Sequence, residues 1–342
     1  MIKKSRIYIN LDIFFSLIIF LIKTLFYKNH NKIIEKKFNY EISKYTNLKY
    51  IFDMSFCRSA FYFTLMSLKK GQKKEVLISP YALYPMINMI IYAGCKPIFI
   101  DFDKDKMELS LTKIKKKINK NTLAVLLTNY TGTNSNISFI YKFLKKRKIF
   151  LIEDCAIQFK KNLPVRSDFK LYSFNLTKNI NAINGGIVGT NNKKLSELLK
   201  KKISKYKVIQ RSFLVKKIIV AAFLKSLISD FIFNTLFFYI IKLGYLKNIN
   251  SFFKFYRPDH NPTLKNQIPD YLKTRMTVSQ KEIILKQLIK SDKSFNLRFE
   301  KAQIYFKEMK NIKFLHIPYG KIIDSSFLDF IILCKDNKTK NI

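Results

Sequence analysis

Short, continuous apolar runs recur along the chain and are separated by longer segments with helical spacing. Runs of this kind lie at residues 123–131, 149–152 and 169–174, and residues 51–54 are a further short strand. A short apolar run without alternation is typical of a strand that is buried on both faces. Residues 75–103 have the pattern of a strand, a helix and a second strand, with a turn at Ala93-Gly94. The alternation of strands and helices predicts an α/β fold.

Charged and glycine residues interrupt this pattern in one stretch, residues 148–190. A buried run there stops abruptly at Glu153-Asp154, and the next run leads to Lys178. The carboxyl end of a buried strand is the edge at which open α/β sheets place their ligands. Gly185-Gly186 then precede another strand-like segment, where glycines allow the backbone to turn tightly or to approach a bound group closely. We therefore expect the chemistry of the protein in this stretch.

Two motifs in this stretch resemble those of the DegT/StrS-type aminotransferases. They are IEDCA at residues 152–156 and SFNLTKNINAINGG at residues 173–186. The resemblance implies a fold-type-I enzyme that uses pyridoxal 5'-phosphate (PLP). It implies an aspartate-aminotransferase-like large domain with a mostly parallel sheet, and a truncated small C-terminal α/β domain. It also implies that Lys178 forms the Schiff base and that Asp154 faces the pyridine nitrogen.

The chemistry of the two side chains agrees with these roles. A lysine amine can condense with an aldehyde and later move a proton, provided that burial or a neighbouring charge lowers its pKa. An aspartate beside the ring nitrogen keeps that nitrogen protonated, so the ring can accept electrons. The alternative is structural, since Lys178 is one of 56 lysines and an acid at a strand end is often a helix N-cap.

Further cofactor contacts are implied by the resemblance at other positions. The segment SFCRSAFYF at 55–63 matches the family's phosphate-binding helix start, so Arg58, Ser59 and Ala60 are candidates there. Cys57 stands where glycine is usual, and an ordinary helix start with a buried cysteine is the alternative. Leu83 holds the place of the ring-stacking aromatic residue, with Tyr81 and Tyr84 as neighbours.

Three other positions complete the comparison with the family. Ser173 belongs to the cofactor-binding motif, and Asn129 stands where many relatives have His. Lys273 replaces an asparagine that reaches the cofactor phosphate across the dimer, and a lysine could meet that phosphate as a point charge. Ile157 replaces a glutamine that contacts the cofactor, with Gln158 one place late. The shared site implies a homodimer.

The composition limits the classes of partner. The chain has 64 basic and 23 acidic residues and a net charge of +41. Only eight basic residues are Arg, and the lysines are scattered, so the excess does not predict a nucleic-acid surface. The four cysteines have no CxxC spacing and the three histidines lie far apart, which favours neither disulfides nor zinc. A reducing cytoplasm fits best, and no cleavage site for a signal peptide is evident.

Two apolar stretches, residues 7–27 and 212–247, carry more aromatic and branched apolar surface than a soluble dimer needs. Asp12 and Asp230 interrupt them, so neither has an uncharged run long enough to cross a bilayer. Peripheral binding at the inner membrane face is one interpretation, and packing against a core or a partner subunit is the other. The expected division is an apolar helical segment, a PLP-binding domain, a hydrophobic insertion and a partial small domain, at residues 1–45, 46–205, 206–262 and 263–342.

The sequence thus predicts an aminotransferase that moves an amino group from an amino-acid donor, glutamate by preference, to a keto-sugar nucleotide. The product would enter surface polysaccharide or glycolipid synthesis. Some relatives are dehydratases with histidine in place of the Schiff-base lysine, and Lys178 argues against that route. The alternative is a degenerate relative that binds PLP poorly and acts as a membrane-associated scaffold, which Cys57, Leu83, Ile157 and Asn184 would favour.

Overall fold

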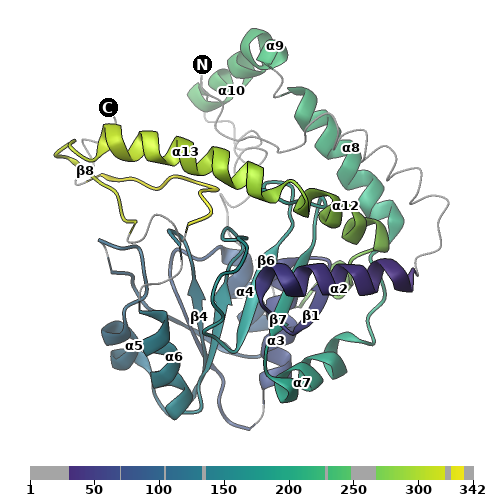
Figure 1. Cartoon of the computed structure of the whole chain (residues 1–342), viewed down its shortest axis with the longest axis vertical. Helices are drawn as coiled ribbons and strands as arrows, with labels where there is room; N and C mark the ends of the chain where they lie inside the picture. The colour runs from purple at the N-terminus through teal and green to yellow at the C-terminus, as the bar shows by residue number, and fades with distance from the viewer. Residues whose placement is uncertain are drawn as a thin grey trace.

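A computed structural model describes residues 31–69, 71–103, 105–132, 136–227, 230–247, 267–319 and 325–334. Its centre is a seven-stranded sheet with the order β1-β7-β6-β5-β4-β2-β3 (Figure 1). The strands are β1 (Tyr50–Met54), β2 (Glu75–Ile78), β3 (Lys96–Phe99), β4 (Thr122–Thr128), β5 (Phe150–Asp154), β6 (Phe169–Ser173) and β7 (Gly186–Thr190). β7 is antiparallel to β6 and β1, and the other pairings are parallel. The predicted α/β class with a mostly parallel sheet is confirmed.

Helices cover both faces of this sheet, as its continuous apolar strands require. On β5, Ile152 packs into the core under α3 (Cys57–Leu68), α4 (Tyr84–Tyr92) and α7 (Lys193–Ile203). Its neighbour Leu151 points to the opposite face, into the core under α5 (Leu111–Lys117) and α6 (Ile137–Lys146). On this opposite face, α2 (Lys32–Thr46) and α12 (Val278–Leu288) cover the strands nearer β7.

The C-terminal part of the described chain forms a second, smaller core. The 3-10 helix η2 (Asp270–Leu272) and α12 pack on the large sheet. The helix α13 (Ser291–Met309) packs against the aromatic side chains of the segment that joins β8 (Leu315–His316) to β9 (Leu333–Cys334). The second core is aromatic and includes Tyr319 and Phe327. The predicted start of the small domain at residue 263 stays a prediction. The helix α12 follows that position in the sequence but packs on the large sheet.

Residues 211–247 project from the body as a helical arm, drawn at the top of Figure 1. The arm consists of α8 (Arg211–Leu227), α9 (Asp230–Ile232), the π-helical turn η1 (Phe233–Phe237) and α10 (Phe238–Leu246). Among the described helices, none combines the length and the apolar character needed to cross a membrane. The other predicted apolar stretch, residues 7–27, lies outside the described residues.

Candidate active site

Asp154 ends β5 at the carboxyl edge of the parallel strands. Alternation places its side chain on the α3 side of the sheet, and Glu153 on the other. The buried carboxylate accepts a hydrogen bond at Oδ1 from the amide of Ala156, at 3.0 Å. Burial raises the pKa of Asp154, although this hydrogen bond and the Lys178 cation act in the opposite direction. Asp154 is therefore a buried acid whose charged form is favoured by a backbone amide and by a nearby cation.

Lys178 lies in the loop between β6 and β7. Backbone hydrogen bonds close this loop, from Leu176 N to Ile183 O at 3.1 Å and from Ala182 N to Phe174 O at 2.9 Å. Burial lowers the pKa of Lys178, and the charge of Asp154 is the largest effect that opposes it. The structure thus brings Asp154 and Lys178 close enough to influence each other. Their catalytic role stays a prediction.

The start of α3 lies beside this pair, since Asp154 and Lys178 both affect the pKa of the Cys57 thiol, which burial raises. Phe56 precedes the helix and gives no side-chain hydrogen bond to its first turn. The Ser59 hydroxyl is buried and has no hydrogen-bond partner among the described residues. The Arg58 guanidinium lies 4.5 Å from the centre of the Phe56 ring, and Ala60 packs in the core. An uncapped helix start with an unpartnered hydroxyl is a suitable place for an anion.

Gly186 is required for a close contact between β7 and the start of α3. A Cβ atom at Gly186 would lie 2.2 Å from the nitrogen and 2.4 Å from the Cα of Cys57. These are backbone atoms and cannot move aside as a flexible side chain could. The close approach at Gly186 is therefore made to the α3 backbone, and an approach to a bound group stays a prediction. Gly185 has φ of +148°, and a Cβ there would meet the sulfur of Met276 at 2.7 Å.

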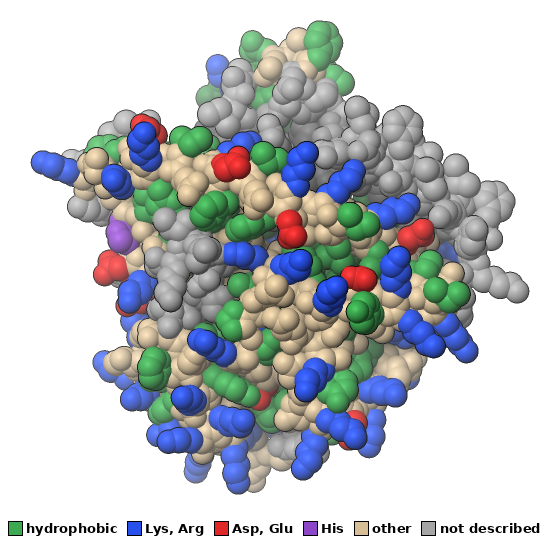
Figure 2. All heavy atoms as spheres, in the orientation of Figure 1, with side chains coloured by type: hydrophobic (Ala, Val, Ile, Leu, Met, Phe, Trp, Pro, Cys, Tyr) green, Lys and Arg blue, Asp and Glu red, His purple; other side chains and the backbone are tan. Residues whose placement is uncertain are grey.

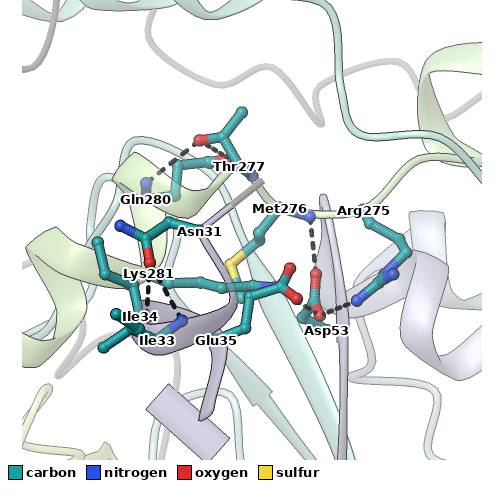
Figure 3. A network of polar contacts seen from close by, with 10 residues as sticks. All are labelled: Asn31, Ile33, Ile34, Glu35, Asp53, Arg275, Met276, Thr277, Gln280 and Lys281. Atoms are coloured by element: carbon teal, nitrogen blue, oxygen red, sulfur yellow. Dashed lines mark hydrogen bonds and ion pairs between the residues drawn. The ribbon is translucent and has the colours of Figure 1, made fainter. Parts of the chain in front are cut away.

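A buried ion network fixes the strand that leads to α3 (Figure 3). Asp53 on β1 pairs through Oδ1 with Arg275 at 2.8 Å and with Lys281 at 3.0 Å. Its Oδ2 accepts a hydrogen bond from the amide of Met276 at 3.0 Å, and Lys281 also pairs with Glu35 at 3.2 Å. Burial favours a higher pKa for Asp53, but Lys281 and Arg275 outweigh it and hold the pKa below its usual value. The network ties α2, β1 and α12 together two residues before Ser55.

The Lys178 loop is tied to the same elements. Asn184 donates from Nδ2 to the carbonyl of Ser55 at 3.0 Å. Gln280 on α12 donates from Nε2 to the carbonyls of Asn184 at 2.7 Å and Ala182 at 3.1 Å. Asn184 stands where relatives have Glu, and here its amide joins the loop to the start of α3. The relative position of Lys178 and α3 is thus set by buried hydrogen bonds.

The remaining predicted residues lie on other elements. Ser173 ends β6 and pairs in register with Gly186. Leu83 precedes α4 and is 63% exposed. Lys273 pairs with Asp270 at 3.0 Å, and in the described part of the chain no hydrogen bond or ion pair joins it to Asp154 or Lys178.

Two residues near the pair, Tyr130 and Asp329, were not predicted from the sequence, and Gln158 was noted there only as one place after the expected glutamine. Tyr130 follows the end of β4, and its pKa is raised by burial and then by the charge of Asp154. Asp329 raises the pKa of Lys178 from the far end of the chain. Gln158 accepts a hydrogen bond from Ser326 N at 2.8 Å and donates to Tyr130 O at 3.3 Å. The position of Tyr130 after a buried strand could have indicated it, whereas no local pattern marks Asp329.

A family comparison identifies the class of protein to which this arrangement belongs. The family model described as the DegT/DnrJ/EryC1/StrS aminotransferase family matches residues 28–211. The chain belongs to this family. The matched region contains Asp154, Lys178 and the start of α3, and the predicted family is confirmed.

Individual relatives agree with this membership. GDP-perosamine synthase of Escherichia coli O157:H7 is 29% identical over 165 residues, which are 47% of this chain and 45% of that protein. The spore coat polysaccharide biosynthesis protein SpsC of Bacillus subtilis (strain 168) is 24% identical over 170 residues, or 48% of this chain and 44% of that protein. Each of these two alignments therefore spans less than half the length of the relative.

Solved structures match over more of the chain. Helicobacter pylori PseC, an aminotransferase involved in the biosynthesis of pseudoaminic acid, has a TM-score of 0.65 and 18% identity, covering 94% of this chain and 75% of PseC. NtdA of Bacillus subtilis, solved with bound cofactor PMP, has a TM-score of 0.71 and 17% identity, covering 100% of this chain and 69% of NtdA. At these identities the likeness shows the fold alone.

The residues present fit the cofactor that the DegT/StrS resemblance implies. PLP carries an aldehyde, a ring nitrogen and a phosphate, and each needs a different partner. Lys178 offers an amine whose pKa is lowered by burial, and Asp154 offers a buried carboxylate. The start of α3 offers uncapped amides and the unpartnered Ser59 hydroxyl.

Proposed function

We propose that this protein is a PLP-dependent aminotransferase that transfers an amino group from glutamate to a keto-sugar nucleotide. The product would serve surface polysaccharide or glycolipid synthesis. The observation that carries the proposal is the buried Asp154 and Lys178 pair beside the uncapped start of α3. Membership of the DegT/DnrJ/EryC1/StrS family and the names of GDP-perosamine synthase and SpsC support the sugar substrate and the pathway.

Each side chain has a distinct task in this proposal. Lys178 holds the aldehyde carbon of the cofactor and then moves a proton at the substrate carbon, for which a lowered amine pKa is suitable. Asp154 faces the ring nitrogen and keeps it protonated. The bound cofactor supplies the electron sink for the substrate carbon. Arg58, Ser59 and Ala60 at the start of α3, with Ser173, hold the phosphate.

A second subunit would complete the site. Lys273 lies on the surface after η2, one-third exposed, with Asp270 as its ion-pair partner. Across a twofold axis, such a lysine could meet the cofactor phosphate of the other subunit as a point charge. Leu83 would cover one face of the ring. The proposed enzyme is therefore a cytoplasmic homodimer.

The attachment point of the cofactor tests the proposal directly. Purified protein is incubated with PLP, reduced with borohydride and mapped by peptide mass spectrometry. We expect the pyridoxyl group on Lys178, with the 55 other lysines as internal controls. Attachment to a different lysine would overturn the assignment, and a protein that takes up no PLP would instead be the non-catalytic scaffold.

Turnover is tested with glutamate and a panel of nucleotide-linked keto-sugars. We expect the wild type to form an amino-sugar nucleotide and Lys178→Ala to form none, because the amine is needed to hold the cofactor and to move the proton. A circular dichroism spectrum that matches the wild type shows that the variant is folded. Equal turnover by the folded variant would refute the role of Lys178.

A further inference from the structure

The helical arm carries a set of apolar side chains that are more than half exposed. On α10, Tyr239, Leu243 and Leu246 are 54%, 55% and 66% exposed. Their spacing of four and three residues places them on one side of the helix. Leu236, in the preceding turn, is 56% exposed. Apolar side chains are visible at the tip of the arm in Figure 2.

The helix α8 is apolar on two opposite sides. Leu214, Ile218 and Ala221 are buried at helical spacing in a core that includes Ile183 and Ile283 of the body. On the outer side, Ile219, Val220 and Phe223 are 60%, 51% and 59% exposed. A helix at the surface of a globular protein needs only the inner stripe. We use the name arm surface for the outer stripe of α8 and the stripe of α10, residues 219, 220, 223, 236, 239, 243 and 246.

The charges around the arm surface limit what can cover it. Residues 211–247 contain six basic residues and one acidic residue, Asp230. The lysines at positions 216, 217, 242 and 247 are exposed and alternate with the apolar positions. In a twofold dimer through this surface, the same patch would meet itself and bring these lysines together. A bilayer containing anionic lipid offers an apolar boundary and the opposite charge.

We propose that the arm surface docks this protein on an anionic membrane, with the apolar side chains at the acyl boundary and the lysines among the head groups. The described helices do not suit a spanning role, so the arm lies in the plane of the interface. The inner side of α8 packs on Ile183, in the loop that carries Lys178. Docking by the arm therefore holds the candidate active site near the membrane surface. This inference does not depend on catalysis.

Vesicle flotation tests the proposal with the full chain. The probe is a vesicle of one part phosphatidylglycerol to two parts phosphatidylcholine, at low salt. We expect the wild type to float, and partitioning to fall at least about 10-fold when the α10 stripe is lost, because apolar burial contributes to binding. The stripe variant is Tyr239→Ser, Leu243→Ser and Leu246→Ser. The matched control is Phe139→Ser with Ile304→Ser, which removes apolar side chains that are 66% and 60% exposed elsewhere, and it should float as the wild type does.

A charge variant separates the electrostatic contribution to membrane binding from the apolar one. We expect Lys242→Gln with Lys247→Gln to weaken flotation at low salt. The difference from the wild type should vanish near 1 M salt, where the Debye length is about 3 Å. Vesicles of phosphatidylcholine alone should capture less wild-type protein at low salt.

Three outcomes would overturn the proposal. In the first, the wild type stays with the soluble fraction at low salt. In the second, the stripe variant floats as well as the wild type. In the third, the stripe variant changes from dimer to monomer in light scattering without lipid, which would show that the arm surface is a contact between copies. None of these results alters the borohydride test of Lys178.

Discussion

Lys281→Met should destabilise the protein strongly, because it removes one of the two cations that hold Asp53. The Lys281 side chain is 3% exposed and that of Asp53 is 6% exposed, so the pair is buried. Breaking a buried pair by removal of one partner costs about 3–5 kcal/mol, since the remaining charge stays in the interior. Arg275, which contacts Asp53 at 2.8 Å, is retained in the variant. We therefore expect the lower end, about 3 kcal/mol.

The matched control is Lys273→Met, which makes the same substitution in an exposed pair. Its partner Asp270 is 96% exposed, and such pairs contribute about 0–1 kcal/mol. Urea unfolding can be followed by tyrosine fluorescence, because the chain has 19 Tyr and no Trp. With an m-value of about 3 kcal/mol/M, Lys281→Met should lower the midpoint by about 1 M. A midpoint shift no larger than that of Lys273→Met would refute this account of the network.

The same network has a predictable pH dependence. The folded-state pKa of Asp53 lies below its usual value of 3.8. Between these two values the unfolded chain binds more protons, so stability rises with pH. The contribution of Asp53 is complete above pH 3.8 and is lost as the pH falls through the folded-state value. We expect the difference in the free energy of unfolding between the wild type and Lys281→Met to shrink in that acid range. A difference that stays constant with pH would contradict the ionic explanation.

Three further predictions concern the candidate site. Asp154→Asn should keep its PLP absorbance but lose turnover on the order of 10²-fold, because a neutral amide no longer holds the ring nitrogen protonated; equal half-reaction rates at equal cofactor occupancy would make Asp154 structural. Gly186→Ala should destabilise the protein by about 1–3 kcal/mol, since the new Cβ meets backbone atoms at the start of α3. The control is Gly71→Ala, whose Cβ meets nothing within 4 Å and which should cost only about 1 kcal/mol of backbone strain at φ +71°. Similar urea midpoints for the two variants would contradict the contact. Competitive acetylation followed by mass spectrometry compares the two lysines. The acetylation rate of Lys178 should reach half its maximum at a lower pH than that of Lys273, because burial lowers the pKa of Lys178 and Asp270 raises the pKa of Lys273. The reverse order would be incompatible with a buried Lys178 amine.

The local pattern predicted the strands and the chemistry at their ends. Continuous apolar runs gave the positions of β4, β5 and β6, because a strand covered on both faces has no polar alternation. The position of Asp154 followed from the rule that ligands bind at carboxyl strand ends, whereas its proximity to Lys178 was implied by the resemblance of the two motifs to the DegT/StrS family. Both inferences use residues that are near one another in the sequence.

Contacts between distant residues could not be predicted in this way. Arg275 and Lys281 neutralise Asp53 across more than 220 positions of sequence, and nothing in either segment marks the other as its partner. The anchoring of Ser326 by Gln158 is of the same kind, because an amide side chain can bond to any exposed backbone group. Whether an apolar helix face is covered or exposed also depends on tertiary packing, so the two sides of α8 could not be assigned from composition.

The hydrogen bonds of Gln158 have a consequence for the order in which the protein is made. During synthesis the chain emerges from its N-terminus at about 5–20 residues per second. Gln158 and Tyr130 are therefore available on the order of ten seconds before Ser326. The sheet can collapse in that interval, but the edge beside Asp154 remains open until the last described segment arrives. A nascent chain halted before residue 325 would therefore have the strands of the site without the segment that Gln158 binds.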